Sequence, residues 1–168
     1  MMLGLSLANF TLLHVVISVV AIAAGLVVMF GMLSSQTMPA MTGIFLLTTI
    51  LTSVTGFMFP FTQLLPSHVL AIISLVLLAV ACVALYARHL AGFWRPVYVV
   101  SALVSLYLNV FVLVIQAFLK VGPLHALAPS VPPSEPPFAI VQGIVLLLFV
   151  VATIIGALKF RPPPVSVA

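Results

Sequence analysis

The sequence predicts an all-α integral membrane protein, in which five transmembrane helices form one bundle with the N-terminus outside and the C-terminus inside. Of the 168 residues, 65% are hydrophobic and the mean hydropathy is +1.48, so the chain has too little polar surface to cover a soluble globule. The apolar residues fall into five stretches, each long enough to cross a hydrocarbon core of about 30 Å. The few charged residues, five Lys or Arg and one acidic residue, lie between these stretches or at their ends.

The five spans are expected to follow one another within a single domain that covers residues 1–168. The first span comes after the uncharged segment Met1–Asn9, which favours a retained helix over a cleavable signal peptide, and it ends before the polar string Ser34–Thr37. Pro60 is expected to end the second span, and Pro66 with the capping residue Ser67 to begin the third. The expected spans are residues 9–33, 39–61, 67–90, 95–119 and 138–160.

The fourth span carries polar residues along one face. At 100° per residue on a helix they fall within an arc of roughly 100°, while the rest of the span is mostly Val, Leu and Phe. An amide without a partner is costly in hydrocarbon, so this face should point into the bundle or into a wet cavity. This polar stripe consists of Tyr98, Ser101, Ser105, Asn109, Gln116 and Lys120.

A proline-rich loop joins the fourth and fifth spans. Its six prolines between Val121 and Pro137 predict an extended segment without helix. The basic residues predict the orientation, because Lys and Arg are enriched on the cytoplasmic side of membrane proteins. Lys120 lies alone on one side of the predicted membrane, next to this loop, and the other four basic residues lie on the opposite side: Arg88, Arg95, Lys159 and Arg161. The N-terminus and the proline-rich loop are therefore expected outside.

The sequence also predicts a polar pocket near the outer face. At 1.5 Å per residue, four spans place an uncommon polar side chain within about one or two turns of that face, and the loop adds two more. The expected ligand-binding residues are His14, His68, Gln116 and Gln142 from the spans, His125 and Glu135 from the loop, and Asn109 deeper in the membrane. Simpler interpretations stay open, namely packing or hydration of the histidines, hydrogen bonding of Asn109 between helices, and an ion pair of Glu135 with Lys120.

These residues favour a protein that binds a redox cofactor or a hydrophobic small molecule, either haem b or a quinone, for electron transfer. Histidines on two different helices could ligate haem, and an apolar cleft with His, Gln and Tyr side chains suits a quinone. Two alternatives are a small-molecule or ion transporter or channel that uses the polar stripe, and an accessory subunit of a larger membrane complex. An enzyme would need His14 or His68 as a base, and no catalytic motif accompanies them. No metal site is expected, since Cys82, the single cysteine, lacks a partner at ligand spacing.

The expected location is the inner membrane of a bacterial cell, as a multi-pass protein. The run from Leu47 to Lys120 resembles small bacterial membrane proteins, and this resemblance implies no role for any residue. The expected partners are the lipid bilayer and a hydrophobic small molecule or lipid, with a homo-oligomer or a larger complex also open. Nucleic acid is not expected, because the pI near 9.9 rests on a few charges that topology explains.

Overall fold

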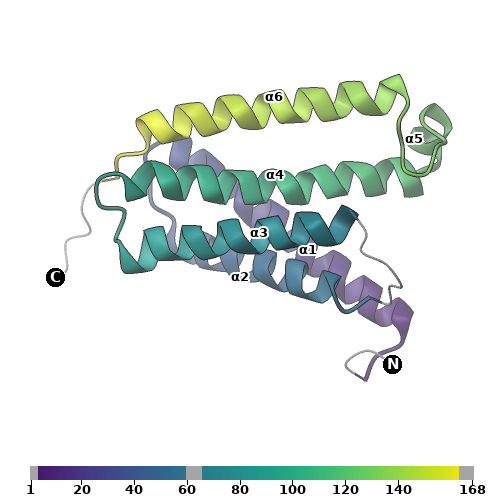
Figure 1. The fold of residues 1–168 in the computed structure, drawn as a ribbon, viewed down its shortest axis with the longest axis horizontal. Helices are drawn as coiled ribbons and strands as arrows, with labels where there is room; N and C mark the ends of the chain where they lie inside the picture. Colours follow the sequence, from purple (N-terminus) through teal and green to yellow (C-terminus); the bar gives the residue numbers. More distant parts are fainter. Residues whose placement is uncertain (1–3, 60–65, 163–168) are drawn as a thin grey trace.

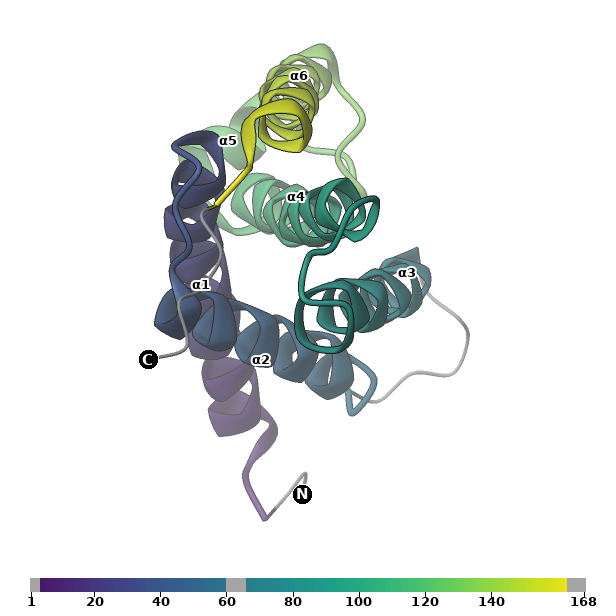
Figure 2. The ribbon, with the colours of Figure 1, turned by 90° about the vertical axis from the view of Figure 1, so that its left-hand side faces the viewer.

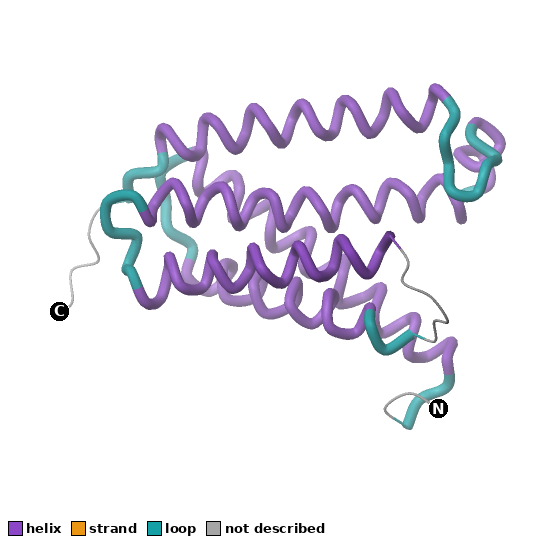
Figure 3. Tube along the Cα trace, in the orientation of Figure 1, coloured by secondary structure: helices purple, strands orange, loops and turns teal. Residues whose placement is uncertain are grey.

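A computed structural model describes residues 4–59 and 66–162, which form helices joined by loops (Figure 3). Five of the helices are long and apolar enough to span a membrane, which agrees with an all-helical, multi-pass membrane protein. The third span is an α-helix that continues as a short π-helix, and a short helix lies between the fourth and the last span. The helices are α1 (Leu7–Leu33), α2 (Pro39–Gly56), α3 (Pro66–Cys82) with η1 (Val83–Ala87), α4 (Trp94–Lys120), α5 (Gly122–Leu127) and α6 (Pro136–Lys159).

Helix α4 lies between α6 on one side and α3 on the other (Figure 1). Helix α1 crosses the bundle, so that its C-terminal end approaches α6 while its N-terminal end lies on the far side of the bundle, near α2 (Figures 1 and 2). The core forms where these helices meet: Phe45 of α2, Leu78 of α3 and Leu106 of α4 are each at most 1% exposed. Van der Waals packing of such side chains, rather than exclusion of water, holds helices together in lipid.

Helices α1, α2 and α4 approach one another closely at Gly25. A Cβ atom at this position would lie 2.5 Å from Leu106 Cδ1 and 2.8 Å from Phe45 Cδ2, which is closer than real Cβ contacts. Small residues allow membrane helices to come into such contact. Gly25 therefore sets how closely α1 can cross α2 and α4.

The loops gather at the two ends of the bundle (Figures 1 and 3). One end, termed the basic end here, contains the α1–α2 loop, the η1–α4 loop and the C-terminal end of α6. It holds the four basic residues Arg88, Arg95, Lys159 and Arg161. The opposite end, termed the loop end, contains the C-terminal end of α4, α5 and the first turn of α6.

Three helical features differ from what the sequence predicts. Helix α2 ends at Gly56, before the expected Phe61, which lies outside the described residues; the approach to Pro60 disfavours helical backbone. The proline-rich segment contains α5, because Pro123 stands in its first turn, where the missing N–H is not needed. The third span widens into a π-helix over Val83–Ala87, for which local sequence gives no signal.

Candidate functional site

The polar stripe of α4 faces the bundle only over its first half. Tyr98, Ser101 and Ser105 are buried, whereas Gln116 and Lys120 are exposed. The hydroxyls of Ser101 and Ser105 donate to backbone carbonyls one turn earlier in α4, at 2.7 and 2.8 Å. Both serine hydroxyls are satisfied within their own helix, so they serve helix packing and give a transport pathway no support.

His14 of α1 is bound to the C-terminal end of α2. Its Nδ1 lies 2.7 Å from Thr55 Oγ1, and the same hydroxyl lies 2.7 Å from the carbonyl oxygen of Leu51. The carbonyl can only accept the single hydroxyl proton, so His14 Nδ1–H donates to Thr55, and Nε2 carries the lone pair of the neutral ring. The ring of Phe59 packs edge-on against the imidazole at 5.2 Å. His14 therefore ties α1 to α2.

His68 of α3 occupies different surroundings. It is 4% exposed and stacks on the ring of Phe57, with centroids 5.5 Å apart and planes at 20°. Haem ligation by two histidines requires both rings to face one gap. None of the described contacts joins the ring of His68 to that of His14, since one stacks on Phe57 and the other packs against Phe59.

Gln142 connects α6 to α4. It is 8% exposed, and its Nε2 donates to the carbonyl oxygen of Phe111 at 3.0 Å. Among residues 4–59 and 66–162, its Oε1 has no hydrogen-bond partner, and neither has the buried Nδ2 of Asn109. Both amides lie on interior faces of the bundle, and the hydrogen bond of Gln142 contributes to holding the peripheral helix α6 in place.

The two predicted loop residues stabilise the loop end. His125 Nδ1 lies 3.3 Å from the carbonyl oxygen of Phe118. The Glu135 carboxylate accepts hydrogen bonds from the backbone N–H groups of Ser130 and Ser134, both at 3.0 Å, and from the Ser130 hydroxyl. These bonds, the Ser130 hydroxyl foremost, hold the pKa of Glu135 at about 2, below its usual 4.5. Glu135 thus closes the turn before α6, and its partners in the described residues are serines instead of the expected Lys120.

The predicted outer residues therefore have three separate surroundings. His14 and His68 contact the end of α2, Gln142 and His125 contact α4, and Glu135 closes the loop. Figures 1 and 2 both show the N-terminal half of α1 and helix α6 on opposite sides of the bundle. The described contacts do not gather these side chains around one ligand.

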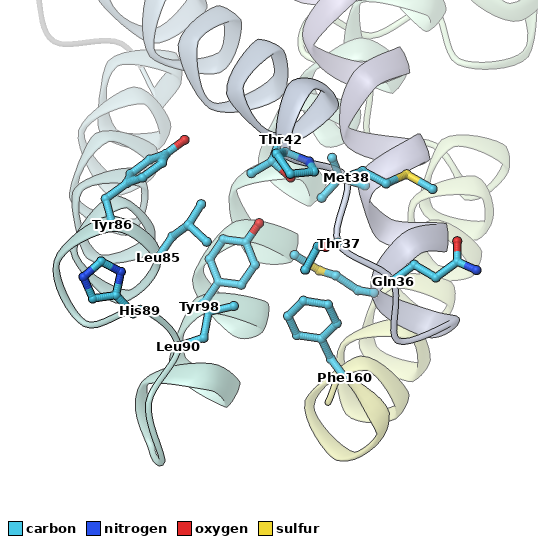
Figure 4. A pocket seen from close by; sticks show the side chains of 13 residues that line it. Gln36, Thr37, Met38, Thr42, Leu85, Tyr86, His89, Leu90, Tyr98 and Phe160 are labelled. Atoms are coloured by element: carbon cyan, nitrogen blue, oxygen red, sulfur yellow. The ribbon is translucent and has the colours of Figure 1, made fainter. Parts of the chain in front are cut away.

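A cavity of about 540 Å³ lies instead at the basic end. Its volume is within the range of roughly 300–1,000 Å³ that is typical of small-molecule sites. The walls come from the C-terminal end of α1, the α1–α2 loop, the beginnings of α2 and α4, η1 with the residues after it, and the residue that follows α6 (Figure 4). The lining residues are Val28, Met32, Gln36, Thr37, Met38, Pro39, Thr42, Leu85, Tyr86, His89, Leu90, Tyr98 and Phe160.

The buried part of this cavity is apolar except for one pair of hydroxyl groups. Met32 and Phe160 are 1% and 3% exposed and form an apolar wall. Tyr98 of α4 and Thr42 of α2, 2% and 7% exposed, are the buried polar residues of this lining, and their side-chain hydroxyls lie near each other. Figure 4 shows Tyr98 between Leu85 and Phe160, with its hydroxyl directed toward Thr42. The cavity thus offers two buried hydroxyls inside an apolar enclosure.

The mouth of the cavity is polar, and its backbone is unusual. Gln36, Thr37 and His89 line the cavity with exposed side chains. His89 and Leu90 have positive φ angles of 48° and 56°, a conformation that is uncommon outside glycine. The preceding π-helix contributes further lining residues. Left-handed residues and π-helical turns are both frequent at functional sites, which supports the same location.

The cavity could not be identified from the sequence, because its residues are remote in the chain. In the sequence, Tyr98 belongs to the polar stripe of the fourth span, Thr42 is one of several hydroxyl residues in the second, and Phe160 lies at the end of the fifth. Only the packing of α2 against α4 brings the first two together, and only the turn after α6 adds the third. The one available signal was the polarity of Tyr98 and Thr42 near the same end of two predicted spans.

Over residues 4–59 and 66–162 the chain is thus a helical bundle, with five helices long and apolar enough to span a membrane and a cavity at its basic end. Comparison with protein-family models, curated proteins and solved structures gives no match to it.

Proposed function

We propose that the protein binds a quinone, the hydrophobic redox carrier of membranes, in the cavity at the basic end. The observation that carries this proposal is the hydroxyl pair of Tyr98 and Thr42, which lines the otherwise apolar, buried part of a cavity of about 540 Å³. A quinone head group is an apolar ring with two carbonyl oxygens that can only accept hydrogen bonds. A buried hydroxyl supplies the donor that such an oxygen needs, and the apolar walls accommodate the ring.

The donor chemistry favours a quinone over haem. Haem iron is held by side chains such as a pair of histidines. The cavity is lined by one histidine, His89, whose side chain is exposed at the mouth, whereas the buried polar groups are hydroxyls. His14 and His68 contact the other end of α2, away from this cavity.

The proposed orientation places the cavity in the cytoplasmic leaflet. The basic end carries Arg88, Arg95, Lys159 and Arg161, and clustered basic residues are typical of the cytoplasmic side. With that end inside, the N-terminus and the proline-rich loop 121–137 face outward, in the inner membrane of a bacterial cell. A quinone would then enter the cavity from the inner half of the bilayer.

Quenching of tryptophan fluorescence tests this proposal. The single tryptophan, Trp94, lies one turn before Tyr98 in α4, so a bound quinone should quench its emission. A benzoquinone with a decyl chain, titrated into the detergent-purified protein, should quench saturably. Tyr98→Phe and Thr42→Val should each weaken binding about two- to tenfold, the equivalent of one hydrogen bond of about 0.5–1.5 kcal/mol.

Matched controls lie on the same helices. Tyr107→Phe on α4 and Thr48→Val on α2 remove hydroxyls that lie outside the cavity, and they should bind like the wild type. Absence of saturable quenching in the wild type would reject the proposal. Equal affinity of the wild type and both cavity variants would also reject it.

A further inference from the structure

The wall of the cavity that lies beside Tyr98 is built by the residue that follows α6. The helix ends at Lys159, and Phe160 leaves it with extended backbone, at φ −66° and ψ 95°, while its N–H still donates to the carbonyl oxygen of Gly156 at 2.8 Å. The side chain turns inward and is 3% exposed. Its ring centroid lies 6.1 Å from that of Tyr98, with the planes at 41° (Figure 4). Phe160 therefore forms the part of the cavity wall that lies beside the ring of Tyr98.

A hydrogen bond fixes the backbone that carries this ring. The N–H of Arg161 donates to Ser35 Oγ at 2.7 Å, which ties the end of α6 to the α1–α2 loop. The loop is itself held by bonds from the N–H groups of Ser34 and Gln36 to the carbonyl oxygen of Gly31, at 3.1 and 2.8 Å. Phe160 is thus attached on both sides, to α6 through its own N–H and to the loop through the next residue.

We propose that Phe160 determines the size of the head group that the cavity accepts, and that the wild-type protein prefers a single-ring quinone. This inference rests on the proposed quinone site. A two-ring naphthoquinone differs from a benzoquinone by one fused benzene ring. The phenyl group of Phe160 fills a volume of the same size and shape beside Tyr98. A naphthoquinone whose carbonyl is bonded to Tyr98 would have to place its second ring in the same cavity, where the Phe160 ring takes up the space beside the Tyr98 ring.

Truncation of Phe160 should therefore change the ratio of the benzoquinone and naphthoquinone affinities, and not only the affinity for one quinone. Removing a buried aromatic side chain leaves a cavity that a correctly placed ligand group can fill. A difference of even one methylene group in an apolar pocket changes the discrimination between two ligands about tenfold or more. The loss of a whole aromatic ring should therefore change the discrimination between the two quinones by more than this. The ratio of benzoquinone to naphthoquinone affinity is expected to fall at least tenfold in Phe160→Ala.

The experiment compares two probes with the same decyl chain, one carrying a benzoquinone and the other a naphthoquinone head, by quenching of Trp94. The proteins are the wild type, Phe160→Ala, Phe160→Leu and the control Phe149→Ala. Phe149, which lies within α6, is likewise a buried aromatic residue; it packs against Tyr107 and lies outside the cavity, so its truncation reproduces the loss of packing without changing the wall. Phe160→Ala should favour the naphthoquinone relative to the wild type, Phe160→Leu should shift in the same direction by less, and Phe149→Ala should keep the wild-type ratio.

The outcomes separate this inference from the proposed function. If the wild type binds the benzoquinone and loses affinity in Tyr98→Phe, but the ratio in Phe160→Ala stays within twofold of the wild type, Phe160 does not determine selectivity and the quinone site stands. If Phe160→Ala cannot be purified folded, an unchanged ratio in Phe160→Leu overturns the inference equally. If the wild type binds neither probe, both proposals fail.

Discussion

Gly25→Ala is expected to destabilise the bundle, because the added methyl group has no space. It would lie 2.5 Å from Leu106 Cδ1 and 2.8 and 2.9 Å from two ring carbons of Phe45, so both neighbours must move. Overpacking of this kind costs about 1–3 kcal/mol. The better helix propensity of alanine offsets at most about 1 kcal/mol. With about 2 kcal/mol as the central cost, the net loss is about 1–2 kcal/mol. At about 2–4 °C per kcal/mol for a chain of this size, the melting temperature should fall by about 2–8 °C.

The single cysteine provides the assay for this prediction. Cys82 is half-buried in α3 and should react with a fluorogenic thiol dye as the protein unfolds on heating in detergent. Gly143→Ala is the matched control, because a Cβ at Gly143 meets no atom within 4 Å, and it should leave the melting temperature unchanged or raise it. Adding Leu106→Val to Gly25→Ala removes the closest clash and should recover part of the loss. A Gly25→Ala protein that melts as high as Gly143→Ala would refute the close approach of α1 to α2 and α4.

Three further predictions concern orientation, the central amide and the loop. Val131 and Phe93 are 77% and 78% exposed at opposite ends of the bundle. In a variant without the native cysteine, an impermeant thiol reagent added to intact cells should label Val131→Cys and spare Phe93→Cys. The reverse pattern would invert the proposed topology. The melting temperature of Asn109→Leu should be within about 1 °C of that of the wild type, or higher. The buried Nδ2 has no hydrogen-bond partner in residues 4–59 and 66–162, so the substitution removes a desolvated donor. A melting temperature several degrees lower would contradict this. The pKa of Glu135 is lowered from 4.5 to about 2, so its stabilisation of the loop is complete above pH 4.5 and is lost as the pH falls toward 2. The NMR signal of the Ser130 amide, which donates to Glu135, should therefore titrate near pH 2. A midpoint above pH 4 would disprove these hydrogen bonds.

The helices could be predicted because their signals are local. The expected spans 9–33 and 95–119 lie within two residues of α1 and α4, since the length of an apolar run decides whether a helix crosses a membrane. The grouping of four basic residues at one end of the bundle could also be predicted, because the end at which a basic residue lies follows from its position in the order of the spans. The short helix α5 could not be predicted from composition, because prolines usually break helices, whereas Pro123 occupies a first turn, where proline is tolerated.

The site was harder to predict than the spans, because it depends on how each helix is rotated and crossed. The rise per residue gave the depth of Gln116 and Gln142, but not that one is exposed and the other buried. Likewise, His14 lies about two turns into α1 and His68 in the first turn of α3, and they contact different residues at the end of α2. The pairing of Thr42 with Tyr98 follows from the packing of α2 on α4, which no single segment encodes.

The turn after α6 links the cavity to the order in which the chain is made. Helices α1 to α4 precede α6 in synthesis and can insert before it, yet the cavity remains open beside Tyr98 until Phe160 arrives and Arg161 bonds to Ser35. A membrane intermediate that lacks docked α6 would retain most of the buried core but not the enclosed cavity. Ligand binding would then distinguish a fully assembled protein from one whose C-terminal helix has not yet inserted.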